Sequence, residues 1–215
     1  MSFKFFRNSK ILAPLKCGTR YLEKCLNESG EFISVFDIKS NLYIKNTNTI
    51  IVRPPFEHMT SALFTELYHS IYENDTSVNI EQLEHILHSF IHTECDKHTE
   101  SNYPHWCKDV YDNLYWYWRR NFKCIDVVEL KNLSDFLISK NINLVPYSAD
   151  NYNFKNVIRF DDNNLRHVFY KKEDLLLFVK MNYTDLWNEL LKQVEYSEIY
   201  YNALINRTLL EIKLI

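Results

Sequence analysis

The stretch of residues 11–22 constrains the fold more strongly than any other part of this sequence. It runs from Ile-Leu-Ala-Pro through a tight turn into an amphipathic segment, a pattern typical of a strand that feeds a helix. Gly18, one of only two glycines in 215 residues, lies in the turn. The first N–H groups of a helix have no partner within it, and the helix dipole favours negative charge there. The stretch therefore predicts an anion site, whose side-chain donors are Lys16, Thr19 and Arg20.

The length and composition of the chain suit one α/β domain, which we expect to span residues 1–215. Hydrophobic residues make up 46% of the sequence and charged residues 25%, as in an ordinary globular protein. The net charge of −3 argues against general electrostatic binding of nucleic acid, so we expect no such partner.

The cysteines and the apolar runs bear on the compartment. Five cysteines are an odd number and too few for a disulfide scaffold, so we expect free thiols in a reducing compartment. Residues 1–7 lack the apolar core of a signal peptide, and no run approaches the ~18 apolar residues of a membrane span. The sequence thus predicts a soluble, cytoplasmic protein without a membrane span.

Apolar runs alternate with segments of helical periodicity along the chain. The predicted strands are 9–14, 32–36, 49–52 and 124–130. The predicted helices are 19–27, 56–72, 79–91, 134–140, 171–180 and 183–210, the last within a helical C-terminal extension over 181–215. The segments 41–48, 92–111 and 141–164 are polar and predicted as loops. Alternating strands and helices indicate an α/β fold with a central, mostly parallel sheet flanked by helices.

A second motif follows the strand 49–52. Arg53 comes directly after this strand, and Ser61 lies two turns into the following helix. Both side chains could therefore converge on one phosphate, the arginine with a charge-assisted fork and the serine with its hydroxyl.

These two motifs resemble those of sulfotransferases that use 3′-phosphoadenosine 5′-phosphosulfate (PAPS). Residues 16–20, Lys-Cys-Gly-Thr-Arg, resemble the 5′-phosphosulfate loop, roughly P-K-[ST/C]-G-[ST]-[ST]. In 52–63, four residues stand at the offsets of the 3′-phosphate motif: Arg53, Pro55, Glu57 and Ser61. Pro-His-Trp at 104–106 with 124–133, and then 169–178, resemble further blocks of carbohydrate sulfotransferases. The blocks stand in the family's order over most of residues 9–178, and the chain departs from the pattern at Leu15, Arg20, Pro54 and His58.

The resemblance implies a P-loop-like sulfotransferase fold and transfer of a sulfuryl group from PAPS to a hydroxyl, with a carbohydrate as the expected acceptor. It assigns Lys16 to the leaving oxygen of the nucleotide, where negative charge develops. The donor nucleotide would be held by Lys16, Cys17, Gly18, Thr19, Arg20, Arg53 and Ser61. A solvated surface lysine is the alternative for Lys16.

The resemblance also implies a general base that accepts the proton of the acceptor hydroxyl. In related enzymes this group lies near the end of the second strand, where this chain has Asp37. His105 is the second candidate. Asp37 as a turn residue and His105 as a packing residue beside Trp106 remain open alternatives.

Four other interpretations are weaker. Five histidines and cysteines fall within sixteen residues, namely His92, Cys95, His98, His105 and Cys107. They lack the spacing of a structural zinc site, so we expect no metal. A different P-loop-type nucleotide enzyme is disfavoured because the lysine precedes the glycine. A catalytically degenerate nucleotide-binding module remains an alternative because of the departures from the family pattern. The aromatic cluster at 111–118 could stack on a sugar or base, although core packing is the commoner role of such spacing.

Overall fold

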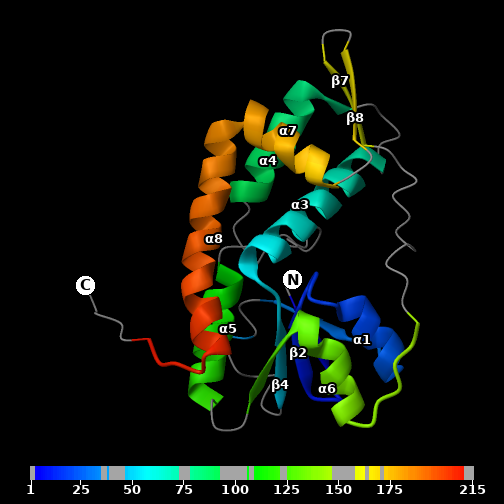
Figure 1. Cartoon of the computed structure of the whole chain (residues 1–215), viewed down its shortest axis with the longest axis vertical. Coiled ribbons are helices and arrows are strands. Elements are labelled where there is room, and N and C mark those ends of the chain that lie inside the picture. Colours follow the sequence, from blue (N-terminus) through cyan, green and yellow to red (C-terminus); the bar gives the residue numbers. More distant parts are fainter. Residues whose placement is uncertain are drawn as a thin grey trace.

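The chain is organised around a five-stranded sheet and a layer of long helices, as its computed structural model shows (Figure 1). The structure describes residues 3–34, 38, 47–72, 78–92, 106, 109–121, 125–146, 158–162, 165–169 and 172–210. The strands of the main sheet are β1 (Phe3–Phe6), β2 (Ile11–Pro14), β3 (Glu31–Ile33), β4 (Thr49–Val52) and β6 (Asp126–Glu129). Their order across the sheet is β3-β1-β2-β4-β6.

This sheet is mixed, which corrects the expectation of a mostly parallel one. β2 pairs in parallel with β4, and β4 pairs in parallel with β6. β1 runs antiparallel to both β2 and β3. β1 is not predicted from the sequence, and it joins β2 through the short segment 7–10. A connection this short can only reverse the chain, because a parallel pair needs a crossover of about a dozen residues or more.

Helices cover both faces of the sheet, which is why β2 and β4 are buried along their whole length. One face packs on α1 (Thr19–Leu26) and α6 (Leu133–Ser139), the latter preceded by the 3-10 turn η1 (Leu130–Asn132). The other face packs on α5 (Asp109–Asn121) and α8 (Thr184–Ile205). Alternate residues of β2 accordingly divide between the two cores: Ile11 and Ala13 face α1 and α6, and Leu12 faces α5 and α8.

The remaining helices form a second layer beyond one edge of the sheet. These are α3 (Pro55–Tyr72), α4 (Ile80–His92) and α7 (Lys172–Asn182). Figure 1 shows α8 running along the molecule, beside α5 at one end and beside α4 and α7 at the other. The helix expected in the C-terminal extension is thus present over 184–205, and it contributes to the main core rather than standing apart from it.

A small second sheet lies at the far end of the helical layer. It contains β5 (Val78–Asn79), β7 (Ile158–Asp162) and β8 (Leu165–Phe169), in the order β5-β7-β8. β7 and β8 are antiparallel and are separated by two residues in sequence, the connection of a tight hairpin. The expectation of a loop throughout 141–164 is therefore wrong for β7, whose sequence alternates apolar and charged residues before Asn163-Asn164.

Candidate anion-binding site

The predicted nucleotide-binding residues follow β2 and β4, two of the three parallel strands that end at one edge of the main sheet. β2 leads through residues 15–18 into α1, β4 leads through Arg53 into α3, and β6 leads into η1. Because these strands are parallel, their carboxyl ends share an edge. In α/β folds, ligands bind preferentially at such an edge.

The loop between β2 and α1 is held by two left-handed backbone positions. Lys16 has φ 66° and Gly18 has φ 77°, and Gly18 is the N-cap of α1. The Cys17 N–H donates to the Pro14 carbonyl at 3.1 Å, which closes the turn. A Cβ atom on Gly18 would lie 2.7 Å from the Leu130 Cδ1 atom, so both the backbone and the packing require glycine here. Glycine offers no side chain to cap the first N–H groups of α1.

Lys16 carries a partly buried positive charge. Burial and the neighbouring Arg20 together lower the pKa of its ammonium group to about 8, while Glu66 of α3 opposes this shift. A cation that has lost part of its hydration and lies beside a second cation is stabilised by a bound anion. Arg20 is exposed and Thr19 is buried, each in the first turn of α1.

Arg53 joins the two predicted motifs. Its Nη1 donates to the Lys16 carbonyl oxygen at 3.3 Å, and its Nε donates to the Glu57 carboxylate at 3.3 Å. The Arg53 side chain is 22% exposed, against 58% for Glu57. A guanidinium group has five N–H donors, so these two bonds leave capacity for an anion. Ser61 is partly exposed on α3, one turn beyond Glu57, and its convergence with Arg53 on one phosphate stays a prediction.

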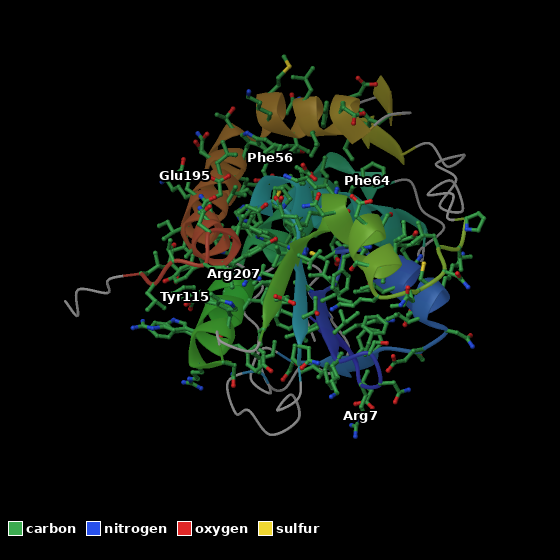
Figure 2. The ribbon with its side chains drawn as sticks, turned by 60° about the horizontal axis from the view of Figure 1, so that its bottom comes forward. Arg7, Phe56, Phe64, Tyr115, Glu195 and Arg207 are labelled. Carbon is green, nitrogen blue, oxygen red and sulfur yellow. The ribbon has the colours of Figure 1, made fainter. Side chains whose placement is uncertain are left out.

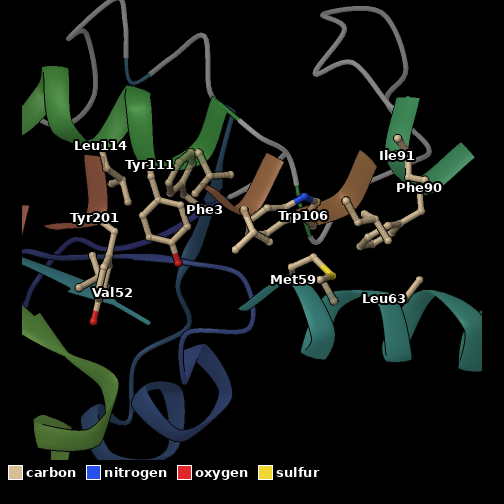
Figure 3. Packing of buried hydrophobic residues seen from close by; sticks show 14 of the residues in the cluster. Phe3, Val52, Met59, Leu63, Phe90, Ile91, Trp106, Tyr111, Leu114 and Tyr201 are labelled. Carbon is tan, nitrogen blue, oxygen red and sulfur yellow. The ribbon is translucent and has the colours of Figure 1, made fainter. Parts of the chain in front are cut away.

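A buried hydrogen-bond network supports Arg53 from the interior. The Tyr111 hydroxyl donates to the Arg53 carbonyl oxygen at 2.5 Å, and the His58 Nδ1 atom lies 3.0 Å from the same hydroxyl. Because Tyr111 gives its proton to the carbonyl, its oxygen accepts from His58, which therefore carries a hydrogen on Nδ1. Both side chains are fully buried, and the Trp106 ring meets His58 edge-on (Figure 3 shows Tyr111 and Trp106 in this core).

This network is not predicted from the sequence. His58 stands out there only as a departure from the phosphate motif, because no local pattern reveals a partner 53 residues away. The fully buried His58 is a support of Arg53, not a surface donor for the nucleotide.

Cys17 packs into the core beneath the loop. It lies in the cluster that contains Ala13, Leu22 and Ile51, and burial raises the pKa of its thiol to about 12. Only its backbone is thus placed to contribute to an anion site.

Glu129 adds a carboxylate at the end of β6. It accepts a hydrogen bond from the Tyr201 hydroxyl of α8 and pairs with the Lys131 ammonium at 2.6 Å. These two donors, Lys131 foremost, lower the pKa of the Glu129 carboxyl. The edge of the sheet therefore carries fixed charges of both signs, with the cations concentrated on the β2 and β4 side.

Both predicted general bases, Asp37 and His105, lie outside the described residues, so their role stays a prediction. Of the five residues considered for zinc, only His92 is described; it stacks on His88 and its Nδ1 lies 3.7 Å from the Glu189 carboxylate. Within the described part of the chain, no three His, Cys, Asp or Glu side chains are arranged to hold a metal ion.

The aromatic cluster of α5 is mainly core. Four of its members are buried, which supports the packing interpretation, and Trp116 is partly buried. The four are Tyr111, Tyr115, Tyr117 and Trp118.

No protein-family model, curated protein or solved structure matches this chain. Among the helices that the structure describes, none combines the length and the apolar character needed to cross a bilayer. The chain is an α/β protein with a mixed five-stranded sheet, and Lys16 and Arg53 contact each other at one edge of this sheet.

Proposed function

We propose that this chain is a sulfotransferase that binds PAPS and transfers its sulfuryl group to a hydroxyl of a carbohydrate, on a P-loop-like sulfotransferase fold. The observation that carries the proposal is the hydrogen bond from the Arg53 guanidinium to the Lys16 carbonyl. Lys16 and Arg53 are 37 residues apart in sequence. The bond brings the segments that resemble the 5′-phosphosulfate and 3′-phosphate motifs to one edge of the sheet. The 5′-phosphosulfate and the 3′-phosphate belong to one nucleotide, so the cations that bind them, Lys16 and Arg53, have to lie close together.

The residues present fit such a donor in their charge. Lys16, the N-terminus of α1 and Arg20 would hold the 5′-phosphosulfate, and Arg53 with Ser61 would hold the 3′-phosphate. PAPS supplies the sulfuryl group when bound. With a pKa of about 8, Lys16 is mostly protonated at pH 7 and offers positive charge to the leaving oxygen. Asp37 or His105 would accept the proton of the acceptor hydroxyl.

A nucleotide-binding module without turnover is the second candidate. The buried position of His58 favours it, because the resembled motif has an arginine at this place and this chain has a fully buried histidine. One fewer cation for the 3′-phosphate predicts weaker binding, and a transfer assay separates the two candidates.

The first test is thermal unfolding with adenosine 3′,5′-bisphosphate, ADP and AMP. A ligand at 100 times its Kd adds about 2.7 kcal/mol, which corresponds to roughly 5–10 °C in a chain of this size. We expect a shift with the 3′-phosphorylated nucleotide alone, and its loss in Arg53→Ala. Arg7→Ala is the matched control, because Arg7 is an exposed arginine paired with Glu31 at 2.9 Å near the opposite edge of the sheet (Figure 2).

The second test incubates the wild-type chain with PAPS and a panel of sugars, and detects sulfated products by mass spectrometry. Product formation that is lost in Lys16→Met supports the sulfotransferase. Nucleotide binding without any product supports the binding module instead. An unchanged unfolding temperature with all three nucleotides would refute both.

A further inference from the structure

β6 is an edge strand whose outer side has no partner strand in the described part of the chain. The Asp126 N–H donates to the Asn48 carbonyl at 2.8 Å, so the backbone of Asp126 faces β4. In a parallel ladder alternate residues face the same neighbour, so Val128 also faces β4. The backbone of Val127 and the N–H of Glu129 therefore point away from the sheet.

A groove of about 560 Å³ follows this free side of β6. Val127, Val128 and Glu129 all line it. Side chains of consecutive strand residues point to opposite faces, so three consecutive residues can share a groove only where it runs along the backbone edge. Asp135 and Phe136 of α6 form one wall, and Ile205 at the end of α8 forms the other. Figure 2 shows β6 between α6 and the C-terminal end of α8, near Arg207.

We propose that this groove binds an extended peptide of a partner protein, which adds a strand to β6 and places a lysine or arginine beside Asp135. Main-chain hydrogen bonds to Val127 and Glu129 would provide affinity, as in other cases of strand addition. Apolar surface is available on both faces of the added strand, from Phe136 on one side and Ile205 on the other. The partner segment therefore has apolar residues at neighbouring positions, one facing Phe136 and the next facing Ile205.

The charges of the groove select a basic peptide over a second copy of this chain. Its described lining includes the carboxylates of Glu129 and Asp135 and no lysine or arginine. Lys131 at 2.6 Å already neutralises Glu129, which leaves Asp135 to attract a cation. A second copy of β6 has Asp126 and Glu129 as its only charged residues, so it would bring further carboxylates into this groove instead of a cation.

The test selects a display library of random seven-residue peptides on the full chain at low salt, and then measures the affinity of the enriched sequences as synthetic peptides. We expect sequences that have apolar residues at neighbouring positions, include a lysine or arginine and lack proline. Binding should fall at least tenfold in Val127→Pro and severalfold in Asp135→Asn. Methylating the peptide N–H groups that face β6 should also abolish it.

Val128→Pro is the matched control, because it removes a hydrogen bond to β4 instead of one facing the groove. We expect Val127→Pro to fold, since edge strands tolerate proline where the N–H faces outward, and Val128→Pro to be strongly destabilised. Equal destabilisation of both variants would overturn the proposal, as would the enrichment of no common sequence or peptides that bind Val127→Pro unchanged. A dimer of the free chain that Val127→Pro dissociates would assign the groove to a second copy and would also overturn it.

Discussion

Replacing Gly18 by alanine tests the loop on which the candidate site depends. Gly18 combines a left-handed φ of 77° with close packing, because an added Cβ would lie 2.7 Å from Leu130 Cδ1 and 3.2 Å from Leu133 Cδ2. The left-handed conformation costs an L-residue about 1–2 kcal/mol. Crowding in a packed region costs about 1–3 kcal/mol, at the low end here because the nearest atom is the end of a partly exposed side chain.

Alanine also lowers the conformational entropy of the unfolded chain, which offsets about 0.4–1 kcal/mol of this destabilisation. Gly18→Ala should therefore lower the free energy of unfolding by about 1–2.5 kcal/mol, or the unfolding temperature by roughly 2–10 °C. Gly30→Ala should stay within about 1 kcal/mol of the wild type, because Gly30 lies outside the left-handed region and its added Cβ meets neighbours no closer than 3.1 Å.

The assay is urea unfolding of Gly18→Ala, Leu130→Ala and the double variant. The cycle measures the contact between the two positions. We expect the double variant to recover about 1 kcal/mol and to leave the backbone contribution in place. Full recovery would show that the backbone at Gly18 is not strained, and a Gly18→Ala variant as stable as the wild type would refute the reasoning altogether.

Three further predictions concern the groups around this loop. The pKa of Lys16 is about 8 in the folded chain and 10.5 for an ordinary lysine, so between these values the unfolded chain holds the extra proton. The stability of the wild type relative to Lys16→Met should therefore rise from pH 8 to 10.5 and stay constant below pH 8, as measured by urea unfolding at each pH. Cys17 is buried and its thiol has a pKa of about 12. At pH 8 a thiol reagent should therefore label the half-buried Cys25 first and Cys17 only on unfolding, as detected by peptide mapping. Equal labelling of both would contradict the burial of Cys17. Tyr111→Phe leaves the Arg53 carbonyl and the His58 N–H without their partner, so it should lower the free energy of unfolding by about 1–3 kcal/mol. Tyr196→Phe removes an exposed hydroxyl and should change this free energy by less than about 0.5 kcal/mol. Similar effects of both variants in urea unfolding would contradict the network.

Much of the secondary structure could be predicted from local pattern. The continuous apolar runs at β2 and β4 and the helical period of α3 identify these elements within one or two residues. β1 was missed because Phe-Lys-Phe-Phe at the start of the chain has no distinctive period, and its partners in β2 and β3 define it. β7 was missed because the surrounding asparagines indicate a loop, although its own residues alternate.

The candidate site shows the same division between local and distant information. Lys16 and Arg53 could be placed together from sequence, because each follows a strand of one parallel pair. Their support by Tyr111 and His58 could not, since it depends on how α5 packs against the start of α3. The acceptor, the base and the assignment of the chain to one domain stay predictions.

The position of α8 in the chain has a consequence for biosynthesis. α8 packs against α3, α4, α5 and α7, and it contributes residues such as Trp187, Leu190 and Tyr201 to the main core. The ribosome makes α8 after every one of those helices, at about 5–20 residues per second. Until α8 is made, the apolar surfaces of α3 and α5 that it covers face water, so the nascent chain exposes a large hydrophobic surface for several seconds. We therefore expect chaperones to bind the nascent chain before α8 is complete.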